Sequence, residues 1–337
     1  MNLYQMTLED LEKYFESIGE KKFKALQVYE WLYQKKKTDV DEFTNLKKEL
    51  REKLKEDFSF KRPEIIKREI DKDVQKFLFL LEDGEKIEAV LMEHNYGLSV
   101  CVSSQVGCNM GCAFCESGRL KKVRNLKVHE MVLQVLTIEE LLEREIHSVV
   151  IMGIGEPLDN YDNVMQFIKI INHPKGLAIG ARHITLSTCG IIPKIKELSH
   201  LGIQINLAIS LHAPNDELRS KLMPINKAYP LKELMSTLKE YIALTHRRVT
   251  MEYILLQGVN DGESHAHELA TLLRGMNAYV NLIPYNETNH LEFKKSSKER
   301  IDRFFNILKQ EKINVTIRRE FGSKISAACG QLRSKEV

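Results

Sequence analysis

The chain has 337 residues, and 43% of them are hydrophobic, which is enough to form one large domain and a smaller one with apolar cores. Lys and Arg total 50 against 47 Asp and Glu, so net charge does not indicate a nucleic-acid partner, and any RNA affinity must come from how the charges are placed. The apolar runs are too short to span a bilayer and no signal peptide is recognisable, so we expect a cytoplasmic protein with reduced cysteines and no membrane partner.

Residues 7–57 predict three short helices. The first begins after Thr7, which is a good N-cap residue. The second covers about 21–33 and leads into three lysines at 35–37, and the third covers 47–57. A lysine run of this kind is either a solvated helix end or, in a helical RNA-binding module, a group of phosphate contacts.

Residues 63–97 predict a β-hairpin. Two runs of alternating apolar residues, 75–81 and 86–92, flank an Asp-Gly turn, which is a strong hairpin signal. On the second run, Glu88 shares a face with apolar residues. It is either an ordinary solvent-facing glutamate or a carboxylate held among apolar groups for proton transfer.

From residue 98 to residue 313, apolar strands alternate with helices. The strands are expected at 99–104, 147–152, 183–187, 204–211, 248–256 and 279–283, and the helices at 127–144, 160–172, 191–201, 231–245, 263–274 and 296–311. Six β/α units in succession predict a parallel sheet covered by helices and curved into a partial barrel. The functional residues of such barrels lie at the C-terminal ends of the strands.

Three cysteines, Cys108, Cys112 and Cys115, follow the first barrel strand with C-x3-C-x2-C spacing. Three thiolates on one loop can each bind a different iron of a [4Fe-4S] cube and leave the fourth iron open for chemistry. The alternative is a zinc site. It would need a fourth ligand at close spacing, and the next histidine, His129, is too distant in the sequence.

Several residues that follow the later strands are implied as ligand-binding by the family resemblance given below. They are Gly155, Glu156, Ser187, Ser210, Leu211, His212 and Asn286. Glycine lets the backbone approach a ligand closely, whereas a single Ser or Asn more often caps a helix. Their recurrence at consecutive strand ends indicates a binding site. Cys189 has no partner motif and is expected to be a small buried apolar group.

The C-terminal region begins with one more predicted strand at 314–320. A segment rich in Gly, Ala and Ser follows it and contains Cys329. Such a segment can fold over the mouth of the barrel.

Two groups of residues carry a family resemblance. The C-x3-C-x2-C spacing, with Phe114 before its last cysteine, resembles the radical S-adenosylmethionine (SAM) superfamily. The string CVSSQVGC at 101–108, together with AACGQL at 327–332, resembles the RlmN/Cfr family of RNA adenosine methyltransferases. The similarity extends over essentially the whole chain.

The resemblance implies an α/β fold, a radical SAM partial (β/α)6 barrel, and four regions. These are a helical RNA-binding accessory domain at 1–62, a β-hairpin region at 63–97, the barrel at 98–313 and a C-terminal strand with a catalytic cysteine loop at 314–337. The implied cofactors are a [4Fe-4S] cluster and two SAM molecules per turnover.

It also implies a role for each candidate residue. The three clustered cysteines hold the cluster, and the residues at the later strand ends bind SAM. Cys329 takes a methyl group from a first SAM, and a radical generated from a second SAM removes a hydrogen from that methyl, so that its carbon adds to the adenine. Glu88 then accepts a proton, and Cys101 releases the RNA by attacking the Cys329 sulfur, which leaves a transient disulfide.

The implied substrates are RNA molecules. One branch of the family methylates C2 of adenosine 2503 in 23S rRNA and C2 of adenosine 37 in tRNAs, and the chain resembles this branch more. The other branch methylates C8 of the same rRNA adenosine and confers antibiotic resistance. A hypothesis from another class is a non-catalytic RNA-binding factor on a radical SAM scaffold.

Two stretches near the expected substrate, 116–122 and 324–326, depart from the family pattern. The expected partners are 23S rRNA, tRNA and an electron donor such as flavodoxin or ferredoxin, and we expect a monomer. RNA contacts are expected from four basic residues: Arg119, Lys121, Lys122 and Arg124.

Overall fold

The structure is a computed structural model, and it describes residues 1–288, 290–318, 325, 327 and 330–332. The expected methyl carrier, Cys329, lies outside these residues, as do positions 324 and 326.

Ten strands form one sheet in the order β1-β2-β3-β4-β7-β8-β9-β10-β11-β12. Their bounds are β1 Glu64–Asp71, β2 Val74–Leu80, β3 Lys86–His94, β4 Gly97–Cys101, β7 Ile146–Ile151, β8 Ile184–Thr188, β9 Asn206–Ser210, β10 Val249–Leu255, β11 Ala278–Pro284 and β12 Asn314–Ile317. Neighbours from β1 to β4 are antiparallel, and neighbours from β4 to β12 are parallel. A separate ribbon pairs β5, Gln105–Val106, with β6, Arg124–Asn125.

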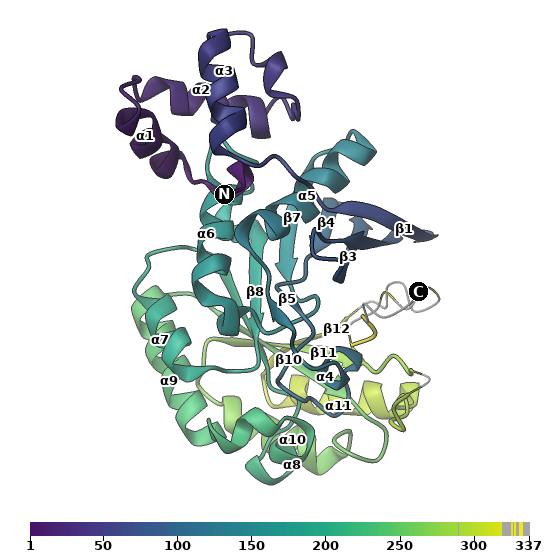
Figure 1. Ribbon diagram of the computed structural model, residues 1–337. Coiled ribbons are helices and arrows are strands. Elements are labelled where there is room, and N and C mark those ends of the chain that lie inside the picture. Colours follow the sequence, from purple (N-terminus) through teal and green to yellow (C-terminus); the bar gives the residue numbers. More distant parts are fainter. Residues whose placement is uncertain (289, 319–324, 326, 328–329, 333–337) are drawn as a thin grey trace.

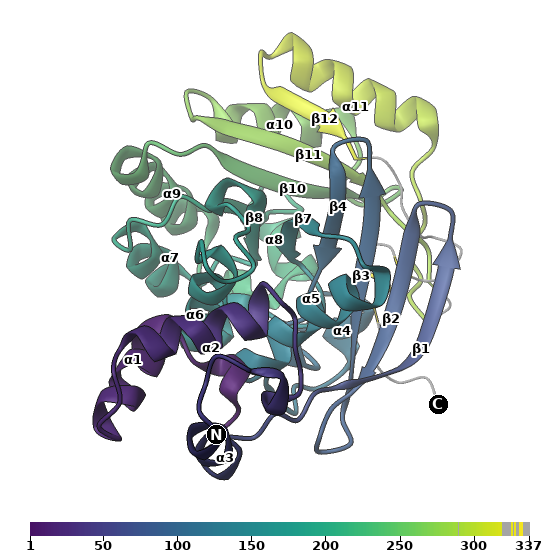
Figure 2. The same ribbon diagram turned by 90° about the horizontal axis from the view of Figure 1, so that it is seen from above.

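The helices of the described part of the chain are α1 Leu8–Ser17, α2 Phe23–Tyr33, α3 Lys48–Asp57, α4 Glu116–Arg119, α5 Val128–Leu142, α6 Tyr161–Asn172, α7 Ile192–Ser199, α8 Asp216–Leu222, α9 Leu231–Thr245, α10 Glu263–Leu273 and α11 Lys298–Gln310. Figure 2 shows α6, α7, α9, α10 and α11 around the outside of the curved sheet. The predicted partial barrel is therefore confirmed, with β4 as its first strand. None of the helices in the ranges described is both long and apolar enough to cross a membrane.

The N-terminal helices α1 to α3 form a separate group next to α6 (Figure 1). Thr7 caps α1 as predicted, because its hydroxyl accepts from the Asp10 N–H and the Asp10 carboxylate accepts from the Thr7 N–H, each at 3.1 Å. The Gln166 side chain of α6 donates to the Gln5 carbonyl at 2.7 Å. This bond ties the N-terminal segment to the barrel.

The three lysines that follow α2 make contacts within the protein. Lys35 lies over the Trp31 ring at 3.4 Å, Lys36 pairs with Glu139 of α5 at 3.1 Å, and Lys37 pairs with Glu42 at 2.7 Å. These cations are already engaged, so the structure favours a structural role for the run over the alternative of phosphate contacts.

The predicted hairpin is formed by β2 and β3, and β1 adds a third strand that the sequence pattern did not single out. On β3, Ile87, Ala89 and Leu91 enter the main core. Val90 and Met92 pack on the other face in a small apolar cluster that also contains Cys101 of β4. Glu88 shares this second face and is only 4% exposed, so the solvent-facing alternative is wrong.

Candidate active site

The cysteine loop lies at the C-terminal ends of the barrel strands, where Cys108, Cys112 and Cys115 line one cavity. The loop is braced by the Cys108 N–H, which donates to the Leu120 carbonyl at 3.0 Å. Burial raises the pKa of the Cys108 thiol to about 12, and it also raises the pKa values of Cys112 and Cys115. Without a metal these thiols stay protonated, so metal binding must displace protons from them.

The donor set suits an iron–sulfur cluster, because three thiols on one loop face a common cavity. Among the residues that the structure describes, no three His, Cys, Asp or Glu side chains converge on a point where one metal ion could be held. Ligands to three separate irons of a cube do not need to converge on one point. Cys108, Cys112 and Cys115 would hold the cluster.

The segment after β7 packs tightly against the segment after β4. A Cβ atom on Gly153 would lie 2.7 Å from the Ser103 nitrogen, and one on Gly155 would lie 2.6 Å from the Gln105 Cβ. Gly155 also has a φ of +112°, which only glycine adopts readily. Side chains are therefore excluded at both positions, and backbone lines the cavity there.

Glu156 is 3% exposed and connects two strand ends. One carboxylate oxygen accepts from the Leu158 N–H at 3.0 Å, and the other accepts from the Cys189 N–H at 2.8 Å. Burial raises the pKa of Glu156, while these hydrogen bonds oppose the rise. The carboxylate thus holds the β7 end against the β8 end.

The same cavity is lined by Ser187 of β8, Ser210 of β9 and His212, which follows β9. The Nδ1 atom of His212 accepts from the Ile254 N–H at 3.0 Å, which places the ring proton on Nε2. Burial, together with the nearby Arg219 charge, lowers the pKa of His212 to about 3. The imidazole is therefore neutral at physiological pH.

Two of the expected SAM-binding residues do not line this cavity. Leu211 packs its side chain into the main core, and its backbone N–H donates to the Glu252 carbonyl at 3.0 Å. Asn286 follows β11 and is 9% exposed. Cys189 is buried, as expected, but it also lines the cavity.

Arg219 of α8 is a buried residue that sequence reasoning missed. It is 0% exposed and donates to the Leu211 carbonyl at 3.2 Å, the Ser210 carbonyl at 3.3 Å and the Cys189 carbonyl at 2.7 Å. It also donates to the Asn226 side chain at 2.9 Å. One guanidinium therefore fixes the ends of β8 and β9, which carry the candidate SAM contacts.

Glu88 and Cys101 occupy the same face of the sheet next to the cavity. Val90 lies directly opposite Cys101 in the β3–β4 pair, and Glu88 is two residues before Val90. The Lys76 ammonium lies 3.3 Å from the Glu88 carboxylate and 2.9 Å from Glu69. Glu88 therefore shares its face with apolar residues, as expected, and a buried lysine accompanies it.

The described residues on either side of Cys329 pack beside Cys101 and form hydrogen bonds with the segment that follows Cys115. Ala327 and Leu332 pack in the cluster that contains Cys101. The Gly330 carbonyl accepts from the Glu116 N–H, and the Leu332 carbonyl accepts from the Ser117 hydroxyl, each at 2.9 Å. Glu116 and Ser117, the first two residues of the atypical stretch, thus hold Gly330 and Leu332 in place.

Two more charged residues, Glu252 and Arg318, line the cavity, and sequence reasoning missed both. Glu252 is a charged residue inside the apolar strand β10, and this irregularity is the signal that could have revealed it.

Of the four basic residues expected to contact RNA, Lys122 pairs with Asp159 at 2.7 Å and Arg124 with Glu130 at 2.8 Å. Because acids already neutralise them, we do not assign RNA contacts to Lys122 and Arg124.

Known proteins resemble the chain over its full length. The radical SAM superfamily model matches residues 102–270, and the model for the ribosomal RNA large subunit methyltransferase N-terminal domain matches residues 1–59. The probable dual-specificity RNA methyltransferase RlmN of Thermoanaerobacter sp. (strain X514) is 53% identical, with 99% of this chain and 98% of that protein covered. The protein of the same name from Acholeplasma laidlawii (strain PG-8A) is 51% identical, with 100% of both chains covered.

A crystal structure of a radical SAM methyltransferase from Sphaerobacter thermophilus has a TM-score of 0.95 and 43% identity, and covers 99% of this chain and 100% of its own. The chain therefore belongs to the radical SAM superfamily and, within it, to the RlmN family of RNA methyltransferases, which makes it a SAM-dependent enzyme with a [4Fe-4S] cluster.

Proposed function

We propose that the protein methylates C2 of adenosine 2503 in 23S rRNA and C2 of adenosine 37 in tRNAs, and that Cys329 carries the methyl group. The names of the full-length relatives support the RNA substrates. The observation that carries the proposal is the meeting of three groups. These are the cysteine-lined cavity, the face with Glu88 and Cys101, and the residues that flank Cys329.

The cofactors would supply a methyl group and a carbon-centred radical. Cys329, as a thiolate, would take the methyl group, because sulfur is a good nucleophile for displacement at carbon. After loss of one hydrogen atom, the methylene carbon on the Cys329 sulfur bonds to C2 of the adenine. The adduct must then give up one electron, for which the oxidised cluster would be the acceptor. RNA and protein are then joined covalently until a second thiol breaks the carbon–sulfur bond.

Cys101 is the proposed second thiol. Its place in the cluster with Ala327 and Leu332 puts it beside the residues that flank Cys329. Attack on the Cys329 sulfur forms a disulfide and leaves the electron pair of the broken bond on the methylene carbon. That carbon takes up a proton, equivalent to the one that the Cys101 thiol releases, and becomes the methyl group of the RNA. The disulfide must then be reduced, and an external donor such as flavodoxin or ferredoxin would supply the electron that starts the radical step.

Glu88 is the proposed acceptor of the C2 proton. The ion pair with Lys76 orients its carboxylate and keeps the two buried charges matched. Burial disfavours the charge on Lys76, but Glu88 and Glu69 outweigh this effect and raise the pKa of Lys76. The ammonium therefore stays charged beside the carboxylate.

Mass spectrometry of nucleosides from 23S rRNA and tRNA, from cells with and without the protein, tests the proposal. We expect 2-methyladenosine in both RNAs only when the protein is present. The appearance of 8-methyladenosine alone would contradict C2 methylation.

Anaerobic reconstitution tests whether the protein is a catalyst or a non-catalytic binding factor. We expect the wild-type protein to bind a [4Fe-4S] cluster and Cys112→Ala to lose it. Cys189→Ala, which alters another buried cysteine of the same cavity, is the matched control and should keep the cluster. A cluster content that is equal in all three proteins would contradict the assignment of the ligands.

A further inference from the structure

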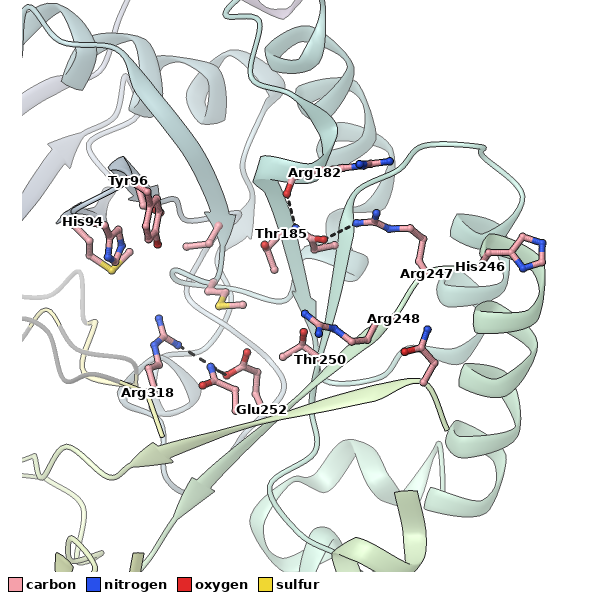
Figure 3. A pocket seen from close by; sticks show the side chains of 17 residues that line it. His94, Tyr96, Arg182, Thr185, His246, Arg247, Arg248, Thr250, Glu252 and Arg318 are labelled. Carbon is pink, nitrogen blue, oxygen red and sulfur yellow. Dashed lines mark hydrogen bonds and ion pairs between the residues drawn. The ribbon is translucent and has the colours of Figure 1, made fainter. Parts of the chain in front are cut away.

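A second chamber lies inside the barrel, on the side of the N-terminal ends of the strands (Figure 3). Its volume is about 860 Å³, within the range of ordinary ligand sites. We call it the lower chamber and define it by six of its lining residues: Tyr96, Arg182, Arg247, Arg248, Glu252 and Arg318.

The lower chamber is strongly cationic, although the whole chain is nearly neutral. Among the described residues, its lining contains four arginines and one carboxylate, that of Glu252. In the part of the chain that the structure describes, Arg182, Arg247 and Arg248 have no carboxylate within ion-pair distance, whereas Arg318 lies 4.0 Å from Glu252. Three positive charges are therefore left for an anionic ligand.

Neutral groups hold two of these arginines in place. The Arg247 guanidinium donates to the Asn206 side chain at 2.6 Å, and the Asn206 amide donates to the Arg182 carbonyl at 2.7 Å. Arg248 lies 4.5 Å from the centre of the Tyr279 ring. Such contacts orient a guanidinium without neutralising it, which suits the binding of phosphate oxygens.

The rim of the chamber carries an exposed aromatic pair. The His94 and Tyr96 rings are stacked with centroids 4.6 Å apart and planes within 8°. Tyr96 is 71% exposed, so the outer face of the pair is open to solvent. Proteins bind single-stranded RNA with such faces, because unpaired bases stack on aromatic rings.

The lower chamber adjoins the cysteine-lined cavity. Met152, Glu252 and Arg318 line both spaces. From Arg248, which precedes β10, to Glu252 within β10, the chamber extends over four residues, or about 13 Å at the usual rise of a strand. A chain that occupies the chamber can therefore reach the cavity with one of its bases.

We propose that the lower chamber binds the ribose–phosphate backbone of RNA next to the adenosine that is modified. Cations spread over a long chamber, together with an aromatic rim, match a nucleotide chain better than a single small anion. This inference rests on the proposed function, because it assumes an RNA substrate. It adds the surface that holds the strand while its base enters the cavity.

The test is a double substitution, Arg247→Gln with Arg248→Gln, in the full-length protein loaded with its cluster. The matched control is Arg274→Gln with Arg303→Gln, which removes the same charge from two arginines whose side chains are 68% and 67% exposed and do not line the chamber. The probe is a tRNA anticodon stem-loop, and its dissociation constant is measured over a series of salt concentrations.

We expect the chamber variant to bind the stem-loop about tenfold more weakly than the control. The slope of the logarithm of affinity against the logarithm of salt concentration should also be smaller by about 1.5, because each lost phosphate contact lowers this slope by about 0.7 to 0.9. Substitution of both residues with Lys should restore most of the slope, because the charge returns. Equal affinity and slope in the chamber and control variants would overturn the inference.

Folding and the proposed function are checked separately. Transfer of a methyl group from SAM to Cys329 without RNA should be unchanged in the chamber variant, because the chamber takes no part in that step. If the double variant does not fold, Arg182→Gln alters an exposed side chain of the same chamber and should give about half of the slope change. A wild-type protein that binds RNA but leaves it unmodified would contradict the proposed function, while the binding comparison would still decide the inference.

Discussion

The substitution Arg219→Met removes the buried guanidinium that joins the ends of β8 and β9. Methionine is similar in length and apolar, so the position remains filled while all four donated hydrogen bonds are lost. The carbonyls of Cys189, Ser210 and Leu211 then lack this donor, although the Leu211 carbonyl still accepts from the Ala213 N–H at 2.8 Å.

The loss of folding stability expected for Arg219→Met follows from two opposing effects. Each buried acceptor left without a donor costs about 1–3 kcal/mol. Removal of a buried charge recovers part of that loss, because a desolvated cation is itself unfavourable. We expect a net loss of about 3–5 kcal/mol in the free energy of unfolding, which is a large part of the 5–15 kcal/mol of a typical domain.

Urea unfolding of the metal-free protein under reducing conditions measures this loss, and equilibrium dialysis of the cluster-loaded protein measures SAM affinity. Arg219→Lys keeps the charge but not the planar fork of donors, so we expect it to lose about 1–3 kcal/mol. Arg274→Met, at an exposed position, should stay within about 0.5 kcal/mol of wild type. A change of less than 1 kcal/mol in Arg219→Met, with unchanged SAM affinity, would refute the assignment of Arg219 as the residue that fixes these strand ends.

Cys101→Ala should trap a covalent RNA–protein adduct through Cys329, visible as a band of retarded mobility, and recovery of free methylated RNA at normal yield would remove Cys101 from the mechanism. His212→Asn should flatten the acid dependence of stability. The folded-state pKa of His212, about 3, is below its unfolded value of 6.5, so the wild type loses up to about 1.4 kcal/mol relative to the variant for each pH unit between about 6.5 and about 3. A pH-independent difference in urea unfolding between the two would contradict the buried, neutral ring. Gly155→Ala should abolish SAM binding, because its Cβ would lie 2.6 Å from the Gln105 Cβ. Gly202→Ala, also at positive φ but with nothing within 4 Å, should keep SAM binding and lose only about 1–2 kcal/mol of stability. Equal SAM affinity in the two variants would refute the close approach at Gly155.

The barrel could be predicted from the sequence because each strand and helix has a clear hydrophobic period. The helix expected at 127–144 is α5, and the strand expected at 248–256 is β10. The three cysteines could be found because they are close in the sequence and one loop presents them together. The exposed strand β1 carries mostly charged residues, so its pattern indicated no buried face.

The residues that sequence reasoning missed depend on contacts between distant segments. Arg219 lies in a short polar helix, and nothing in its neighbours shows that four acceptors surround it. The arginines of the lower chamber come from three separate parts of the chain, 182, 247–248 and 318, and only the curvature of the sheet brings them together. The ion pair between Lys76 and Glu88 likewise depends on the register of β2 and β3.

Mass spectrometry of RNA methylated with SAM that carries a fully deuterated methyl group tests most directly whether Cys329 acts through a radical. One deuterium atom must leave the methyl group before its carbon can bond to the adenine. The product should therefore be 2-methyladenosine whose methyl group retains two of the three deuterium atoms. A methyl group that retains all three would mean direct transfer, and it would contradict the role of Cys329.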